Sequence, residues 1–167
     1  MKYFGIVETK LGVIAIAGKD GKLTNCTLPK PTRDEAIDAM NAGLDDSFVE
    51  DIAAFGLLPD KLKRYCLGEC VVFSDIDIDT SHLRPFQAAA QRAAHQIPYG
   101  TLMTYSELAK EAGSERAARA AGSAMARNTM LIVIPCHRIV TSSGTIGGFG
   151  CGIEWKRTLL KLEGVDI

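Results

Sequence analysis

The sequence has no long hydrophobic run and almost no net charge. No stretch is apolar for long enough to span a membrane, and the residues after Met1 show no secretory signal. With a formal net charge of −1, the chain as a whole is not basic, so its overall charge is no evidence for nucleic acid binding. An acidic half and a basic half can still cancel in this sum. We therefore expect a cytoplasmic protein, or a nuclear one if the source is a eukaryote.

The cysteines lack a regular pattern. The chain has five of them, Cys26, Cys66, Cys70, Cys136 and Cys151, with no repeating spacing. An odd number without a pattern is typical of free thiols in a reducing compartment. Cys66 and Cys70 lie four residues apart, which fits one face of a helix better than a zinc site, because zinc needs three or four ligands. We expect neither a bound metal nor a cofactor.

Charge is distributed unevenly along the chain. Hydrophobic residues make up 47% of the 167 positions, which is enough for the core of one domain or of two small ones. Acidic residues dominate between Glu35 and Asp79, and basic residues dominate between Arg84 and Arg138. We predict a mixed α/β (α+β) chain with two domains, residues 1–80 and 81–167.

Alternating apolar residues in the first half predict an antiparallel meander. Strands are expected at residues 3–7, 13–17 and 23–28, with a turn at residues 20–21. Thr32 can cap a helix that stops near Gly43, and a second helix is expected after Pro59. Residues 71–73 read as a further strand. The first domain is thus a small α/β unit with an antiparallel sheet.

The second half reads as mostly helical. A helix is expected from Pro85 to about residue 96. Thr104 and Glu107 form a capping box at the start of the next helix, which ends at Gly113. Ser114 can cap a further helix to about residue 127. Two short helices joined by a glycine turn are typical of a helix-turn-helix motif.

The last of these helices carries mostly small side chains, among them Ala120, Gly122 and Ser123, with Arg119 near its middle. Its ordinary interpretation is a helix packed tightly against its neighbours. Alternatively, a slim helix can enter the narrow minor groove of DNA, where one arginine can fill the gap left by an extruded base.

An apolar run at residues 132–140 is interrupted by Pro135, Cys136, His137 and Arg138. The β-branched residues on either side predict buried extended segments, with the break presenting Cys136 at the edge of a cavity. A buried inert thiol beside a structural histidine is the ordinary alternative. Our working hypothesis is that Cys136 is a nucleophile.

Three neighbours in the sequence favour the nucleophile. The Asn128 amide can tie the preceding loop to the Cys136 turn, and Glu163 is a carboxylate that can orient His137. Glycines between residues 144 and 152 allow the backbone to approach a flat ligand closely. Together these residues form a Cys, His, Glu relay.

These motifs resemble one known family. Pro135-Cys136-His137-Arg138, preceded by Arg119-Ala120-x-Gly122 and Asn128 and followed by Gly144-x-x-Gly147-Gly148-Phe149, is similar to the active-site signature of the O6-alkylguanine-DNA alkyltransferases. The resemblance covers residues 86–164. It implies a small N-terminal α/β domain that is followed in the chain by a winged-helix-like domain with a helix-turn-helix motif. It also implies a monomer that binds double-stranded DNA, needs no cofactor and acts as a methylated-DNA-[protein]-cysteine S-methyltransferase.

The function implied by this resemblance is DNA repair by direct reversal. The alkyl group of O6-alkylguanine, and of O4-alkylthymine, would pass irreversibly to Cys136 in a single turnover. The resemblance implies three groups of site residues: for catalysis Cys136, His137, Glu163, Asn128 and Tyr105; for DNA binding Arg119, Ala120, Gly122, Ser123, Thr104 and Tyr105; and for the substrate pocket Pro135, Ile139, Phe149, Gly150 and Cys151.

The chain departs from the family pattern beside the expected pocket. Gly150 stands where many members have Ser or Ala, and Cys151 stands where they usually have Gly, which adds bulk and a second thiol. A non-catalytic protein that recognises damaged DNA is the alternative function, but such relatives lack the thiol at the position of Cys136. A promoter-binding regulator is a weaker alternative.

Overall fold

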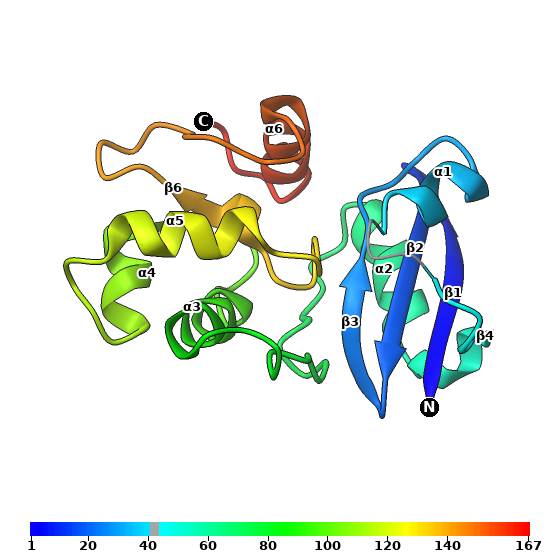
Figure 1. Cartoon of the computed structure of the whole chain (residues 1–167). Coiled ribbons are helices and arrows are strands. Elements are labelled where there is room, and N and C mark those ends of the chain that lie inside the picture. Colours follow the sequence, from blue (N-terminus) through cyan, green and yellow to red (C-terminus); the bar gives the residue numbers. More distant parts are fainter. Residues whose placement is uncertain (41–43) are drawn as a thin grey trace. The chain divides into compact units, whose positions relative to one another are not determined.

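The computed structural model describes residues 1–40 and 44–167. They form two compact units (Figure 1). The first unit combines Met1–Asp79 with Thr129–Val133, and the second combines Thr80–Asn128 with Ile134–Ile167. The prediction of one boundary between residues 80 and 81 did not foresee that the chain returns to the first unit just before Cys136.

The first unit is built on a four-stranded sheet with the order β3-β2-β1-β4. Its strands are β1 (Lys2–Thr9), β2 (Gly12–Lys19), β3 (Lys22–Cys26) and β4 (Phe48–Glu50). The first three pair antiparallel, which confirms the predicted meander, and β4 pairs parallel to β1. Asp20 and Gly21 both have positive φ values, 51° and 81°, as the tight turn between β2 and β3 requires. The short strand β4 was missed.

Two α-helices and a 3-10 helix accompany this sheet: α1 (Arg33–Asp38), η1 (Ile52–Phe55) and α2 (Leu58–Cys66). The Thr32 hydroxyl accepts a hydrogen bond from the Glu35 amide, so the predicted cap of α1 is confirmed. The predicted stop near Gly43 lies outside the described residues. Helix α1 packs on β2, and Ala36 joins Ala15 and Ala17 in a buried cluster.

The strand predicted at residues 71–73 is wrong. These residues pair with no strand. Val71 and Phe73 are nevertheless buried, and the Phe73 ring meets the buried Tyr65 ring of α2 edge-on, with 5.7 Å between centroids. These apolar residues therefore pack against a helix. In the sequence, a short apolar run of this kind cannot be distinguished from a strand.

The second unit is mostly helical, as predicted. Its elements are α3 (Pro85–His95), β5 (Met103–Thr104), α4 (Tyr105–Glu111), α5 (Ala118–Ala126), η2 (Cys136–Arg138), β6 (Ile139–Val140) and α6 (Ile153–Leu162). Helices α3, α4 and α5 pack on one another, and β5 pairs parallel to β6. The capping box is present, because the Thr104 hydroxyl accepts from the Glu107 amide and the Glu107 carboxylate accepts from the Thr104 amide.

Helix α5 begins later than predicted. Its N-cap is Ala117, which makes no side-chain capping bond, and Ser114 instead belongs to the turn in which its carbonyl accepts from the Ala117 amide at 3.1 Å. The shorter helix still contains Arg119 through Ser123, so the segment expected to contact DNA remains helical.

The apolar run before Cys136 forms a turn, so the predicted extended segment at residues 132–134 is wrong. Ile132 has a φ of 70°, a left-handed value that is costly for a β-branched residue. Its side chain is 1% exposed, so burial offsets part of this cost. Upstream, the amide of Cys26 donates to the Thr129 carbonyl and the amide of Leu131 donates to the Cys26 carbonyl, both at 2.9 Å.

Candidate active site

Cys136 opens the 3-10 helix η2 directly after Pro135. Its side chain is held by Asn128, whose amide nitrogen donates to Sγ at 3.2 Å and to the Ile134 carbonyl at 3.0 Å. Asn128 follows the end of α5, so it connects this helix to the turn that carries the thiol, as the sequence predicted. Cys136 is 5% exposed.

A buried network of charged groups follows Cys136 in the chain. His137 Nε2 lies 2.7 Å from Glu163 Oε1. Arg138 donates to the same carboxylate from Nε and Nη2, at 2.9 Å and 2.8 Å, and its Nη1 donates to the Ile97 carbonyl. Glu163 caps the end of α6 and also accepts from the Gly100 amide at 3.0 Å. The predicted contact of His137 with Glu163 is present, whereas the contact of Arg138 with the same carboxylate was not predicted.

The protonation states of this network follow from its contacts. Burial alone would raise the pKa of Glu163, but hydrogen bonds from His137 and Arg138 outweigh it and lower that pKa well below its usual range. Burial lowers the pKa of His137, so the ring is neutral at pH 7. A neutral ring beside a carboxylate carries its hydrogen on Nε2 and a lone pair on Nδ1. His137 is therefore in the tautomer of a base.

The Cys136 thiol is protonated in the unliganded protein. Burial raises its pKa to about 11, although the hydrogen bond from Asn128 and the charge of Lys156 act in the opposite direction. The sequence-based expectation was an activated thiolate near neutral pH. In the structure, Asn128 and Lys156 favour the thiolate, but their effect is smaller than that of burial, so the thiol keeps its proton.

A pocket of about 240 Å³ opens onto Cys136. Five residues predicted for the site line it: Tyr105, Gly122, Cys136, Phe149 and Gly150. Met125, Ala126 and Gly148 complete the lining. The ring of Tyr105 passes Gly122 so closely that a Cβ there would lie 3.8 Å from it. Burial raises the pKa of Tyr105, which keeps its hydroxyl protonated and able to donate.

The remaining predicted residues belong to the second unit but do not line this pocket. Pro135 and Ile139 are buried, and Cys151 is exposed on the turn that follows Gly150. The exposed residues of α5 include Arg119, Ala120 and Ser123. Thr104 uses its hydroxyl to cap α4.

Lys156 of α6 is completely buried. Its Nζ donates to the Ile139 carbonyl at 2.5 Å and to the Gly148 carbonyl at 3.2 Å, and lies 6.0 Å from the centre of the Tyr105 ring. Burial lowers its pKa to about 8. Lys156 thus ties the glycine-rich loop to the strand behind the pocket. A lysine in an amphipathic helix gives no sequence signal that its amine is buried.

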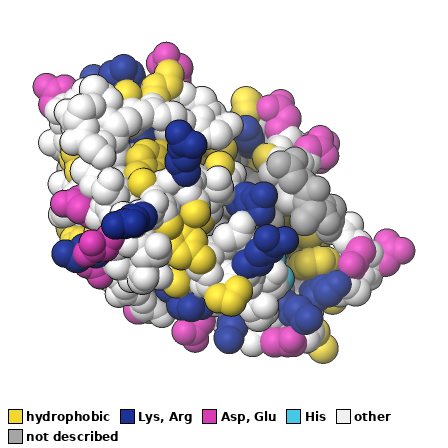
Figure 2. Space-filling model, turned by 60° about the vertical axis from the view of Figure 1, so that its left-hand side comes forward, with side chains coloured by type: hydrophobic (Ala, Val, Ile, Leu, Met, Phe, Trp, Pro, Cys, Tyr) yellow, Lys and Arg dark blue, Asp and Glu magenta, His cyan; other side chains and the backbone are white. Residues whose placement is uncertain are grey.

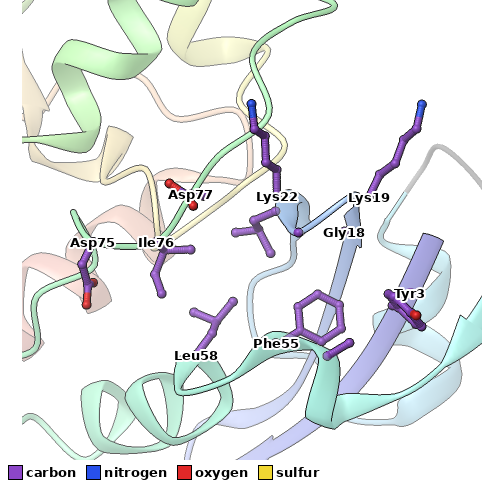
Figure 3. Close-up of a pocket in the computed structure, with 12 residues that line it drawn as sticks. Tyr3, Gly18, Lys19, Lys22, Phe55, Leu58, Asp75, Ile76 and Asp77 are labelled. Carbon is purple, nitrogen blue, oxygen red and sulfur yellow. The ribbon is translucent and has the colours of Figure 1, made fainter. Parts of the chain in front are cut away.

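A second pocket, of about 140 Å³, lies in the first unit (Figure 3). Phe55, Leu58 and Ile76 line it with apolar side chains, whereas the amines of Lys19 and Lys22 point away from them. Its lining contains no cysteine or histidine. Because Cys136 lines it, the pocket of about 240 Å³ in the second unit is the better candidate for covalent chemistry.

Three further observations limit the function. Among residues 1–40 and 44–167, no group of three or more His, Cys, Asp or Glu side chains could hold a metal ion. No helix in the described part of the chain is long and apolar enough to cross a membrane. Figure 2 shows Lys and Arg side chains spread over one face of the molecule, with most acidic side chains near its outline.

Comparisons with known proteins agree on one family. The family description "6-O-methylguanine DNA methyltransferase, DNA binding domain" matches residues 85–165. A methylated-DNA–protein-cysteine methyltransferase of Mycolicibacterium paratuberculosis is 36% identical over 94% of this chain and 89% of its own length. One from Methanosarcina acetivorans is 34% identical over 97% of this chain and 98% of its own length.

Solved structures lead to the same family. The crystal structure of the Mycobacterium tuberculosis protein OGT in complex with DNA has a TM-score of 0.76 and 33% identity, covering 96% of this chain and 92% of that one. Similarity of this extent in both sequence and fold shows that the chain belongs to the methylated-DNA–protein-cysteine methyltransferase family.

Proposed function

We propose that this protein repairs O6-alkylguanine, and O4-alkylthymine, in double-stranded DNA by transferring the alkyl group to Cys136. The observation that carries the proposal is the placement of the Cys136 thiol in a pocket, with Asn128 on its sulfur and the His137–Glu163 pair beside it in the chain. The relatives are named for this activity, and the DNA complex of the M. tuberculosis protein supports DNA as the partner.

The reaction is a single displacement at the alkyl carbon. Cys136 Sγ forms the new bond to carbon while the bond from carbon to O6 breaks, and the electron pair of that bond stays on the guanine. Because the thiol has a pKa of about 11, its proton must leave in the complex, before or during the attack. His137 Nδ1 accepts that proton through a water, and the Tyr105 hydroxyl donates to the departing base.

Glu163 supports this proton transfer from behind His137. Its carboxylate accepts from Nε2 and so fixes the tautomer in which Nδ1 has the lone pair. The negative charge also stabilises the imidazolium that forms when the thiol is deprotonated. The product is a thioether, which ordinary reductants do not cleave, so each molecule acts once.

Backbone groups of the second unit recognise the base. We assign the carbonyls of Cys136 and Ile139 to the exocyclic amine of guanine and the amide of Gly150 to its O6. Each carbonyl already accepts one hydrogen bond, from the Ile139 amide and from Lys156 respectively. A carbonyl oxygen has two lone pairs, so one remains for the base. Pro135 and Phe149 complete the pocket.

Helix α5 is the element that we place in the minor groove. Its exposed residues Arg119, Ala120 and Ser123 give a slim surface with one cation, and Gly122 lies beside the Tyr105 ring. The target nucleotide is flipped into the pocket and Arg119 takes its place in the stack. Thr104 holds the start of α4. The protein acts as a monomer, and its free thiols suit the cytoplasm, or the nucleus of a eukaryote.

A stoichiometric transfer assay tests this function. The full chain is mixed with a duplex that carries one O6-methylguanine with a radioactive methyl group. We expect transfer of one methyl group per protein molecule and no further turnover. Binding of the damaged duplex without transfer would instead identify a non-catalytic damage-recognition protein and would overturn the proposal.

A further inference from the structure

The second unit contains two cysteines, Cys136 and Cys151. Cys136 lines the pocket of about 240 Å³ directly, and Cys151 follows Gly150, which lines the same cavity. The other three cysteines belong to the first unit. The two thiols also interact electrostatically, because a negative charge on Cys151 raises the pKa of Cys136. Both cysteines therefore belong to the segments that form this pocket, although they lie 15 positions apart in the sequence.

The backbone around Cys151 is lightly packed. Cys151 lies in a tight turn that is closed by a hydrogen bond of 3.0 Å from the Gly152 amide to the Phe149 carbonyl. A Cβ added to Gly148 or Gly152 would meet no atom within 4 Å, and one added to Gly150 would meet only the Ala126 carbonyl at 4.0 Å. Lys156 holds the Gly148 carbonyl, so residues 149–152 are the part of the turn that moves toward the pocket to reach the Cα separation of about 4.4–6.8 Å of a disulfide.

The two thiols differ in access. Cys151 is exposed, whereas Cys136 is 5% exposed. A small oxidant therefore reaches Cys151 first, and the Cys136 sulfur can attack the oxidised sulfur once the turn has moved toward the pocket. This order matches the usual division between an accessible sensing thiol and a resolving thiol.

We propose that Cys136 and Cys151 form an intramolecular disulfide when hydrogen peroxide oxidises the protein. The Cys151 thiolate attacks the O–O bond, which gives a sulfenic acid and releases one oxygen as water. The Cys136 sulfur then attacks that sulfur, forms the S–S bond and gives up its proton to the departing hydroxide, which leaves as a second water. The two thiols lose two electrons and two protons, and hydrogen peroxide is reduced to water. The disulfide blocks the nucleophile and narrows the pocket until a thiol reductant restores it.

Peptide mapping tests this pair directly. Trypsin cleaves the denatured chain after Arg127, Arg138 and Lys156, so Cys136 and Cys151 fall in different peptides, residues 128–138 and 139–156. The full chain is treated with one equivalent of hydrogen peroxide, its free thiols are blocked, and the digest is analysed without reductant. We expect the two peptides joined to each other, with loss of the free Cys136 peptide, and release of both by dithiothreitol.

Two variants sharpen the test. Cys151→Ser removes the proposed partner and the accessible thiol, so no linked pair should form and Cys136, which is buried, should be recovered as a free thiol. Cys70→Ser removes an exposed cysteine of the first unit and should leave the linked pair unchanged. Recovery of Cys136 from the oxidised wild-type protein as a free thiol, as a sulfinic acid, or joined to any other cysteine would overturn the proposal.

The consequence for repair rests on the proposed function, but the disulfide does not. If the reduced protein fails to accept a methyl group while the two peptides still become linked, the proposed function fails and the redox pair stands. If methyl transfer occurs in reductant and no linked peptide forms on oxidation, the redox pair fails alone.

Discussion

Each unit of the protein buries a free cysteine, and the surroundings of the two thiols differ. Cys26 in the first unit is 1% exposed and its sulfur contacts only the Thr27 carbonyl, at 3.8 Å, among the hydrogen bonds of the described residues. Cys136 in the second unit is 5% exposed, but it faces a pocket and accepts a hydrogen bond from Asn128. Burial raises the pKa of both thiols, and more strongly for Cys26.

The comparison separates burial from reactivity. A thiol that is surrounded by apolar atoms keeps its proton and fills space like a small hydrophobic side chain. A thiol beside an amide donor, a neutral histidine and a buried lysine can lose its proton when substrate fills the pocket. The structure thus makes Cys136 reactive through its polar neighbours, whereas the side-chain hydrogen bond that the described residues give Cys26 is to the Thr27 carbonyl.

The same substitution at both cysteines gives the largest contrast. Cys136→Ala should abolish methyl transfer from duplex DNA and leave the folded state intact. Cys26→Ala should retain transfer and lower the free energy of unfolding by about 1–2 kcal/mol, because it leaves a small cavity in the core. Transfer assays and urea denaturation measure the two effects. If both variants lost methyl transfer while keeping the wild-type free energy of unfolding, Cys26 and Cys136 would not differ in reactivity as stated.

The next largest effect is expected at Glu163. Glu163→Gln removes the charge that holds His137 and leaves Arg138 buried without its anion, which should destabilise the protein by about 3 kcal/mol. Transfer should slow in the same variant. Urea denaturation at pH 7 measures the stability. Glu115→Gln, at an exposed carboxylate, is the matched control and should change stability by less than about 0.5 kcal/mol.

The Glu163 effect should depend on pH with a defined sign. The folded pKa of this carboxyl lies below its unfolded value, so its contribution is complete above about pH 5 and is lost as pH falls through the folded pKa. The stability difference between the wild type and Glu163→Gln should therefore shrink below about pH 4. A difference that stays constant down to pH 3 would mean that the Glu163 charge contributes no stability.

Asn128 should have an intermediate effect on rate. Asn128→Ala removes the hydrogen bond to Sγ, so the pKa of Cys136 should rise above its present value of about 11. Loss of a bond to a charged acceptor predicts a decrease of about tenfold to a hundredfold in the reaction with free O6-benzylguanine near pH 8. A pH–rate profile is the measurement. A slower reaction with an unshifted profile would indicate that Asn128 only maintains the shape of the turn.

The smallest effect is expected on α5. Arg119→Ala should slow repair in duplex DNA roughly tenfold, because the gap left by the flipped base is no longer filled. The reaction with free O6-benzylguanine involves no flipping and should be unchanged. Arg116→Ala, which removes an equal charge just before the helix, is the control. Equal losses with duplex and free base would show that Arg119 does not act in base extrusion.

The sequence predicted those parts of the fold that local residues determine. The meander follows from alternating apolar residues and the Asp20-Gly21 turn, and the start of α4 follows from its capping box. The turn at Ile132 could not be predicted, because β-branched residues favour strands and only tertiary packing holds one in a left-handed conformation.

The candidate site was predictable to a similar extent. Cys136, Asn128, His137 and Glu163 were expected to meet, and the structure brings them together as two contacts, Asn128 with Cys136 and His137 with Glu163. The roles of Arg138 and Lys156 were not foreseen, since a charged residue shows its burial and its partners only in three dimensions. The high pKa of Cys136 was missed for the same reason.

Mapping the adduct tests the central claim most directly. The full chain is reacted with a duplex that carries one O6-methylguanine, digested with trypsin and analysed by mass spectrometry. We predict that the methyl group resides on Cys136, in the peptide of residues 128–138. An unmodified Cys136 in protein that has bound the duplex, or a methyl group on Cys151 instead, would contradict the account.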